Sequence, residues 1–496
     1  MSADAPVPEA VVSTLDPVAE LLAGALPYHG HPAALPDEQP LPSCSVHRRV
    51  TQPGLAVAIT TRRGEEELAT HHLDVTHLPV DRQRSRPRRR IHPAATSVLT
   101  LAPAVADRED HDDGAIAIVP TGDGDVTIRL PAQGPTPGEV ERIVTVAREH
   151  RFVAVPAPLG IDPVMAAAIV LRVSAAAIAC AVAPQVAAEL TLLHPDLRGA
   201  VAADPALLQG DDLAVARAAA DQRRAAWAHH DLRLAFAPGA DDDWRAILVA
   251  PPRPEVAVLL ATRRPALLES ALAQLAAQRD VDIEVAVLLH GAGDREAGRR
   301  TLVAAGLDGT VEVVDGGVPF GAVLNHGLSR TRAPLVTKWD DDDLYGPHHL
   351  LDLVLAQRHS RAALVGKAPE FVYLQASDTT VWRTPGRAEA ASVGLAGGTF
   401  LSPRAALQEV GGFAPVVRAV DHHLKTRFTA IGAEVFRTHS FGFVLRRHGA
   451  GHTWEADDQR FLDQAVRTFP GLPEVLHLGA AARFARLAAL EPGASA

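Results

Sequence analysis

Four consecutive aspartates, Asp340 to Asp343, follow an apolar segment at residues 335–339 and precede a Gly-Pro turn. Adjacent carboxylates repel one another, so a folded chain accommodates them best where a divalent cation or a bound ligand compensates their charge. The apolar segment is typical of a strand, which places the aspartates at the carboxyl edge of a sheet, where open α/β folds bind ligands. A solvated acidic turn is the alternative, but the pattern of the downstream half favours a metal site.

The elements that position these aspartates begin after Pro251-Pro252-Arg253-Pro254, because prolines stiffen a linker and interrupt both helices and strands. Downstream, apolar strand patterns alternate with helix patterns through short Gly-rich connections. The predicted strands are residues 256–261, 283–289, 311–314 and 335–339, and the predicted helices include 297–305 and 321–329. This alternation indicates a parallel sheet of the nucleotide-binding kind.

The whole chain has 496 residues, which is too long for one ordinary domain. Residues 1–45 are rich in proline, alanine and acids, which predicts a disordered lead-in. Residues 46–250 mix strand and helix patterns and predict a separate α/β domain of unassigned type and role. Residues 254–455 form a second α/β domain, and residues 456–496 have the pattern of a helical tail.

Composition and charge narrow the function classes. There are 48 basic and 59 acidic residues, and the net charge of −11 argues against a general nucleic-acid-binding protein. Two cysteines, Cys44 and Cys180, cannot build a disulfide framework, so a reducing compartment is expected. The most apolar window is interrupted by Arg172 and Pro184, so no transmembrane segment is predicted, and no signal peptide is visible. We therefore expect a cytoplasmic protein, with peripheral contact at the inner face of a membrane left open.

Several motifs of the second domain occur in a fixed order. They are the first strand, Thr262-Arg263-Arg264-Pro265, Asn325-His326-Gly327-Leu328, Ala333-Pro334-Leu335-Val336, and the four aspartates. This order resembles the nucleotide-binding half of family 2 glycosyltransferases, whose GT-A fold carries an Asn-x-Gly helix followed by Asp-x-Asp-Asp. Downstream, Gly397-Gly398-Thr399 and then Gly411-Gly412-Phe413 are similar to the acceptor-side segment of that family. The resemblance covers roughly residues 254–455.

The resemblance implies metal-dependent, inverting transfer of a sugar from a nucleoside-diphosphate sugar to an acceptor hydroxyl. A divalent cation, Mn²⁺ or Mg²⁺, offsets the charge that develops on the leaving diphosphate, and carboxylates suit both ions. The implied metal ligands are Asp340, Asp342 and His452, with Asp340 also near the ribose. Asp343 would order the neighbouring ligands or cap the following helix. Asp421 matches the family's catalytic base, and its alternative role is the N-cap of the helix that it opens.

The resemblance also implies a set of residues that contact the nucleotide sugar. They are Thr262, Arg263, Arg264, Asp294, Asn325, Lys338, Asp340, Asp341, Arg446 and Arg447. The two last arginines begin a Gly-hinged segment, residues 446–454, that is similar to the loop closing over the diphosphate.

Two departures from the family pattern leave alternatives open. The loop at residues 289–294 lacks the usual uracil-reading aspartate, for which Asp294 or Asp315 is a substitute, and Val420 stands where a glutamate often precedes the base. A degenerate, non-catalytic sugar-nucleotide-binding or scaffold protein is therefore the main alternative. A nucleotidyltransferase is a weaker one, because residues 262–265 are not a Gly-rich phosphate loop followed by lysine.

Other questions stay open at this level. The acceptor is a glycan, a metabolite or a protein side chain. Residues 46–250 resemble a degenerate GT-B transferase domain only faintly, at Asp204-Pro205 and Arg223-Arg224, and an acceptor-docking or oligomerisation module is the alternative. A homo-oligomer is compatible with either role.

Overall fold

A computed structural model describes twelve stretches of the chain. They are residues 43–51, 54–63, 66–74, 98–103, 116–122, 125–148, 150–203, 212–230, 251–291, 293–383, 388–447 and 458–485. Contacts divide the chain into two compact units, Met1–His92 and Pro93–Ala496. The boundary falls inside the predicted 46–250 domain. Of the predicted disordered lead-in, only residues 43–45 are described, and they begin a strand.

The first unit contains a three-stranded antiparallel sheet. Its strands are β1 (Ser43–Thr51), β2 (Gly54–Arg63) and β3 (Glu66–Asp74), and they pair in that order.

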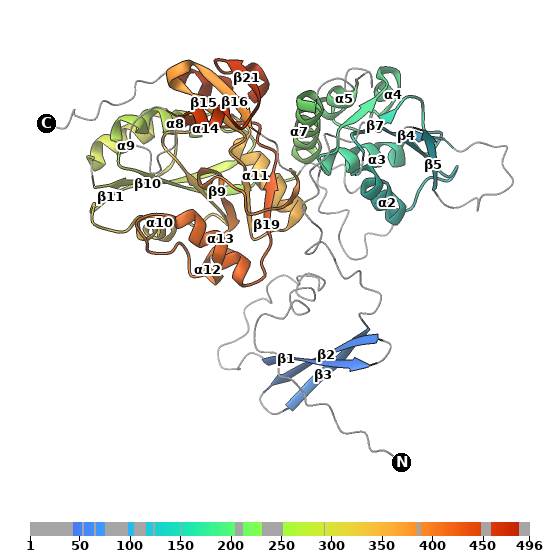
Figure 1. The fold of residues 1–496 in the computed structure, drawn as a ribbon, viewed down its shortest axis with the longest axis horizontal. Coiled ribbons are helices and arrows are strands. Elements are labelled where there is room, and N and C mark those ends of the chain that lie inside the picture. Colours follow the sequence, from blue (N-terminus) through green and yellow to red (C-terminus); the bar gives the residue numbers. More distant parts are fainter. Residues whose placement is uncertain are drawn as a thin grey trace. The chain divides into compact units, whose positions relative to one another are not determined.

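The second unit begins with a five-stranded sheet of order β5-β6-β4-β7-β8, which we call the first sheet (Figure 1). Its strands are β4 (Val98–Ala102), β5 (Ala117–Gly122), β6 (Asp125–Arg129), β7 (Phe152–Val155) and β8 (Cys180–Val182). All neighbours are parallel except the β5–β6 hairpin. The accompanying helices are α2 (Pro137–Ala147), α3 (Pro163–Ala175), α4 (Pro184–Glu189), α5 (Pro195–Val201) and α7 (Asp212–His229).

Local sequence explains two of these helix starts. Thr136 and Glu139 form a capping box that opens α2, and Asp162 caps α3 by accepting the Val164 N–H at 2.8 Å. Residues 166–175 of α3 are all buried, and five of these ten are alanine or serine, whose small side chains let the helix pack closely within this part of the unit.

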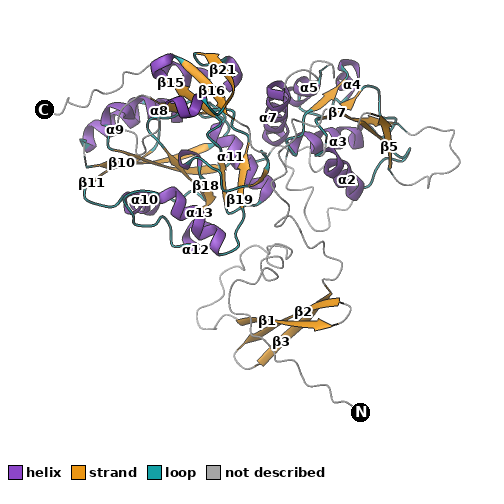
Figure 2. Cartoon of the chain, viewed as in Figure 1, coloured by secondary structure: helices purple, strands orange, loops and turns teal. Residues whose placement is uncertain are grey.

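The larger sheet has the order β11-β10-β9-β12-β18-β14-β19-β17, and we call it the second sheet (Figure 2). Its first four strands are β9 (Glu255–Thr262), β10 (Asp282–His290), β11 (Gly309–Val314) and β12 (Leu335–Trp339), and they are parallel. The predicted strands and the mixed α/β class are thus confirmed. Their connecting segments contain α8 (Leu268–Ala276), α9 (Arg295–Ala304) and α10 (Phe320–Ser329).

The remaining strands extend the second sheet beyond β12. β18 (Leu401–Pro403) runs antiparallel to β12, and β14 (Leu364–Lys367), β19 (Val435–Thr438) and β17 (Ala390–Ala391) follow. The accompanying helices are α11 (His349–Ser360), α12 (Arg404–Glu409) and α13 (Val420–Ala430). A short 3-10 helix, Gly397–Thr399, precedes β18 and packs next to β12.

A companion five-stranded sheet has the order β13-β20-β15-β16-β21. Its strands are β13 (Leu344–Tyr345), β15 (Phe371–Leu374), β16 (Thr379–Arg383), β20 (Phe443–Arg447) and β21 (Ala465–Pro470). β21 lies in the tail that was predicted to be helical, so that tail is not all helix: alongside β21 it forms α14 (Asp458–Leu462) and two 3-10 turns, Glu474–Leu476 and Gly479–Phe484. Antiparallel pairing with β16, which a local pattern does not reveal, produces this strand.

Helix α7 connects the first sheet to the second through buried ion pairs. Arg224 donates to Asp352 of α11 through two nitrogens at 2.6 and 2.8 Å, and Lys367 reaches the same carboxylate at 2.7 Å. Burial alone would raise the pKa of Asp352, but Arg224 and Lys367 hold it well below its usual range. The neighbouring Arg223 pairs with Glu389 at 2.6 Å.

Within the described stretches, no helix has both the length and the hydrophobicity that a membrane-spanning helix needs.

Candidate active site

The four aspartates lie at the carboxyl edge of the second sheet, as the sequence predicts. They follow β12 directly, and β12 pairs with β9 so that Trp339 lies opposite Leu260. This register brings the aspartates level with Thr262, the last residue of β9, whose hydroxyl donates a hydrogen bond to Asp341. We use the name acidic corner for Asp340 to Asp343 together with Asp421.

The aspartates alternate between buried and accessible environments. Asp341 is buried and bonds to Thr262 and Arg264, while Asp343 is buried and accepts the Arg446 N–H at 3.1 Å. Burial and the charges of neighbouring aspartates raise the pKa of both carboxyls, that of Asp343 well above its usual range. The side chains of Asp340 and Asp342 remain 32% and 15% exposed, so these two acids are the ones that a ligand can reach.

Lys338 connects the aspartate run to Asp421. Its Nζ lies 3.0 Å from Asp340 Oδ1 and 3.2 Å from Asp421 Oδ1. Burial lowers the pKa of Lys338, but the two carboxylates outweigh burial and raise it above its ordinary value, so the side chain stays cationic. Burial, with the charges of Asp421 and Asp342, raises the pKa of Asp340 to about 6 despite Lys338.

Two glycines form a wall against these acids. A Cβ on Gly397 would lie 1.8 Å from Asp421 Oδ2, and a Cβ on Gly398 would lie 2.7 Å from Asp340 Oδ2. No side chain fits at such separations, so the backbone at Gly397 and Gly398 fixes how deeply both carboxylates lie. This explains why the sequence has two adjacent glycines here.

Asp421 is not the N-cap of its helix, so that alternative is wrong. The cap position of α13 is Ala419, which has a left-handed backbone with φ of 60° and no side-chain cap bond. Val420 is buried in a core cluster with Leu424 and Phe428, which explains the apolar residue beside Asp421. Similarly, Asp343 does not cap α11, whose cap position is His348.

The turn after β9 places its two arginines differently. Arg264 pairs with Asp341 and, at 2.9 Å, with Asp342, while its buried Nη1 has no hydrogen-bond partner among the described residues. Arg263 donates to His290 at 3.2 Å and to the Gly316 carbonyl at 3.1 Å. Arg264 therefore belongs to the acidic corner, whereas Arg263 holds the loop after β11 against the end of β10.

Three other predicted contact residues use their polar side-chain groups to bond to backbone groups of this chain. Asp294 caps α9 by accepting the Glu296 N–H at 2.7 Å, and Asp315 accepts the Gly317 N–H at 2.8 Å. The Asn325 amide both donates to the Phe413 carbonyl and accepts the Phe413 N–H, each at 2.8 Å. The structure thus shows Asn325 fixing the Gly411-Gly412-Phe413 turn.

Arg446 and Arg447 lie in strand β20 and not in a loop. Arg446 is buried, and its guanidinium donates to the carbonyls of Asp342 and Phe484, both at 2.9 Å. Arg447 is also buried, with its guanidinium 5.7 Å from the Phe461 ring centre. The predicted metal ligand His452 lies outside the described residues.

Sequence reasoning missed Tyr345, which supports the site. Its hydroxyl donates to the Gly398 carbonyl and accepts the Asp340 N–H, both at 3.1 Å. The ring stacks on Trp339 at 3.8 Å, and the buried Gln274 accepts the Tyr345 N–H at 2.8 Å. A tyrosine two residues after the aspartates, in a chain with three tyrosines, was the available indication.

The donor set of the acidic corner fits a hard divalent cation. Its five side chains offer only carboxylate oxygens, which Mg²⁺ and Mn²⁺ prefer. Lys338 and Arg264 compensate only part of this charge, and burial together with the neighbouring aspartates raises the pKa of Asp340, Asp341 and Asp343.

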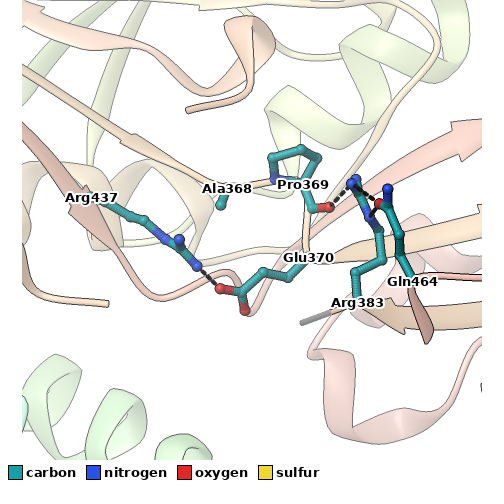
Figure 3. Close-up of a pocket in the computed structure, with 6 residues that line it drawn as sticks. All are labelled: Ala368, Pro369, Glu370, Arg383, Arg437 and Gln464. Atoms are coloured by element: carbon teal, nitrogen blue, oxygen red, sulfur yellow. Dashed lines mark hydrogen bonds and ion pairs between the residues drawn. The ribbon is translucent and has the colours of Figure 1, made fainter. Parts of the chain in front are cut away.

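A cavity of about 310 Å³ opens elsewhere in this half of the chain (Figure 3). It is lined by Ala368, Pro369, Glu370, Arg383, Arg437 and Gln464. Glu370 pairs with Arg437, and Arg383 donates to Gln464 and, at 3.3 Å, to the Pro369 carbonyl (Figure 3). None of the residues predicted from the sequence lines it.

No protein-family model and no curated protein matches the chain. Among solved structures it is similar to S. aureus TarS 1-349 in complex with UDP-GlcNAc, with 14% identity over 42% of this chain and 64% of that one and a TM-score of 0.34. It is also similar to the mannosyltransferase PcManGT from Pyrobaculum calidifontis in complex with GDP-Man and Mn²⁺, with 18% identity over 47% and 70% of the two chains and a TM-score of 0.32. The chain spans less than two thirds of that TarS structure. Because both TM-scores lie below 0.5, the functional assignment rests on the residues of this chain.

Proposed function

We propose that the chain is a metal-dependent, inverting glycosyltransferase of GT-A type that moves a sugar from a nucleoside-diphosphate sugar to an acceptor hydroxyl. The observation that carries this proposal is the bridge made by Lys338 between Asp340 and Asp421, at 3.0 and 3.2 Å. Such a transfer needs a cation-binding carboxylate beside the donor and a base beside the acceptor, both within reach of one sugar ring. The fold thus brings Lys338 into contact with Asp421, which lies 83 residues later in the sequence.

Asp340 and Asp342 are the proposed ligands of Mn²⁺ or Mg²⁺, and His452 is the third in the proposal. When bound, the cation would offset the negative charge that develops on the leaving diphosphate. Arg264 supports the same end of the donor, because its buried Nη1 has no hydrogen-bond partner among the described residues and suits a phosphate oxygen.

Asp421 is the proposed base, which takes the proton of the acceptor hydroxyl as that oxygen attacks the anomeric carbon. Lys338 and the wall at Gly397 fix its carboxylate beside Asp340. Tyr345 connects the two sides, because it bonds to the backbone of both Asp340 and Gly398. A carboxylate held in this way is preorganised for the proposed role of base, and such preorganisation is a large part of what the reaction requires.

The donor's nucleobase is proposed to be read by groups other than Asp294 and Asp315. Both carboxylates are engaged by backbone N–H groups of their own turns, at 2.7 and 2.8 Å. A carboxylate that binds uracil would have to give up these bonds. Asp294 and Asp315 therefore give no reason to expect a uridine nucleotide rather than another one as the donor.

The test is a thermal-shift panel of UDP, GDP, CDP and dTDP, with and without Mn²⁺. We expect one diphosphate to raise the melting temperature of the wild type only when Mn²⁺ is present, because a ligand that binds the folded state stabilises it. Asp342→Asn should abolish this shift. Asp282→Asn is the matched control, because Asp282 is exposed at the opposite end of β10.

Two outcomes contradict the proposal: no diphosphate shifts the melting temperature, or Asp342→Asn responds like Asp282→Asn. A third measurement separates the scaffold alternative. The sugar nucleotide that matches the selected diphosphate is incubated with the wild type, and released nucleotide is quantified. Metal-dependent binding with no transfer or hydrolysis would favour a non-catalytic protein.

A further inference from the structure

Two histidines and an aspartate gather at the ends of two helices that accompany the first sheet. His194 is the N-cap residue of α5, Asp196 lies in the first turn of α5, and His229 is the last residue of α7. One donor atom from each side chain lies within 4.8 Å of the other two. Helices α5 and α7 pack together, which brings these ends into contact (Figure 1).

The separations within this cluster suit a small cation. His229 Nε2 lies 2.9 Å from Asp196 Oδ2, and His194 Nδ1 lies 3.6 Å from the same oxygen. Two ligands that each lie about 2.1 Å from a tetrahedral zinc ion are about 3.4 Å apart. The observed values lie on either side of this distance. To bind the ion, His194 Nδ1 would give up the Asp196 N–H that it accepts at 3.3 Å, and the stacked rings would turn toward the ion.

A third imidazole stands next to the pair. His230 follows α7, is only 2% exposed, and accepts the His194 N–H at its Nε2 at 3.3 Å. Its buried Nδ1 has no hydrogen-bond partner among the described residues. A buried polar atom without a partner is uncommon and calls for an explanation. Because Nε2 accepts a hydrogen bond, Nδ1 is a donor, and the oxygen of a water molecule bound to a nearby ion would accept from it.

The ligand types distinguish this cluster from the acidic corner. Imidazole nitrogens favour borderline transition metals such as Zn²⁺ and Co²⁺, whereas sites made only of carboxylates favour Mg²⁺ or Mn²⁺. The two rings also stack, with centroids 3.4 Å apart and an interplanar angle of 12°, so both imidazoles lie beside the Asp196 carboxylate. Two imidazole nitrogens and one carboxylate oxygen are ligand types that Zn²⁺ takes in proteins.

We propose that His194, Asp196 and His229 form a structural zinc site, supported from its buried side by His230. The ion ties the start of α5 to the end of α7. Its effect reaches the elements around the second sheet, because Arg223 and Arg224 of α7 pair with Glu389, next to β17, and with the buried Asp352 of α11. The site is independent of sugar transfer.

The test uses the full chain without an affinity tag, stripped with a chelator. An Asp342→Asn background is used, so that the acidic corner does not contribute a competing ion. We expect one zinc ion per chain in equilibrium dialysis, and visible absorption bands of tetrahedral cobalt when Co²⁺ replaces it. Excess Mg²⁺ should not displace the zinc.

Two further substitutions in this background locate the site. Asp196→Asn and His229→Ala should each weaken zinc binding by at least about 100-fold. Asp196→Asn is the more conservative change, because this side chain is 65% exposed and the substitution preserves its size. His326→Ala, at a partly buried histidine on α10, is the control and should bind zinc normally.

Three results would overturn the assignment: no zinc bound in the background protein, no tetrahedral cobalt spectrum, or equal zinc affinity in Asp196→Asn and His326→Ala. Circular dichroism of each variant separates loss of a ligand from loss of fold. An unfolded His229→Ala variant leaves Asp196→Asn to decide the question.

Discussion

The first and second sheets of the larger unit share a parallel architecture but differ at their carboxyl edges. In the first sheet, each parallel strand is followed within two residues by a proline, namely Pro103, Pro131, Pro156 and Pro184. Proline has no N–H group, so these connections offer few backbone donors to a bound anion. In the second sheet, the corresponding strand ends carry Thr262 to Arg264, His290 and Asp340 to Asp343. Of these two edges, only that of the second sheet carries a cluster of polar and charged side chains able to bind a ligand.

An acid at a strand-helix connection is therefore not sufficient evidence for a site. Asp162, in the connection between β7 and α3, uses its carboxylate to cap α3. Asp421 instead shares a buried lysine with Asp340, and a glycine lies where a side chain would displace it. The difference lies in the partners of the carboxylate, which local sequence does not reveal.

The largest expected effect separates these two acids directly. Asp421→Asn should lower turnover of the sugar nucleotide selected by the thermal-shift panel by about 1,000-fold, because the amide cannot accept the acceptor proton. Binding of the donor should be retained. Asp162→Asn should leave turnover unchanged, since asparagine caps a helix as well as aspartate. Equal losses in the two variants would remove the distinction between the edges.

The next effect concerns the contact between α7 and the second sheet. Arg224→Met should reduce the free energy of unfolding in urea by about 3 kcal/mol, because it leaves the fully buried Asp352 with fewer cationic partners. Arg217→Met is the control, since Arg217 lies about two turns earlier on the same helix and makes a partly exposed pair with Asp221. If both variants lose the same stability, the buried pair does not connect the two sheets energetically.

A third prediction tests the glycine wall. Gly397→Ala should lower turnover by about 100-fold, because its Cβ would displace the Asp421 carboxylate, and misplacement by about 1 Å has effects of that size. Gly394→Ala is the matched control, as its Cβ would meet only Ser392 Oγ at 3.5 Å. Normal turnover in Gly397→Ala would show that the position of Asp421 is not set by this wall.

Sequence patterns predicted the elements whose residues are close together in the chain. The strand at 335–339 matches β12, because its apolar run ends at a charge, and the alternating segments after residue 254 match β9 to β11. The division into units and the strand β21 were not predicted, since both depend on contacts between distant residues. The pattern of β21 is locally weak, and only its pairing with β16 defines it.

The candidate site shows the same limit. The four adjacent aspartates predicted an acidic edge. Which of them are buried and which are accessible depends on the pairing of β12 with β9, which the sequence does not reveal. Lys338 was predicted as a contact of the nucleotide sugar, whereas its bridge to Asp421 spans 83 residues. The helix-cap role of Asp294 and the turn bond of Asp315 are both local, and the spacing to the following N–H groups could have indicated them.

The smallest expected effect concerns His349. This residue packs behind the carboxyl edge of the second sheet, against Trp339, Tyr345 and Phe443. Its ring is fully buried, and burial, with the charge of Lys367, lowers its pKa well below 6.5. Below pH 6.5 the unfolded chain therefore binds a proton that the folded chain does not, so the free energy of unfolding falls as the pH decreases.

His349→Phe should remove this contribution and keep the aromatic packing. Between pH 6.5 and 5.5 the variant should lose about 1 kcal/mol less stability than the wild type, as expected for one proton over one pH unit. Urea denaturation at both pH values measures the difference, with His326→Phe on α10 as the control. Parallel pH dependences in His349→Phe and the wild type would mean that the layer behind the acidic corner admits a proton when folded. The edge would then be less tightly enclosed than the packing of Trp339 and Tyr345 indicates.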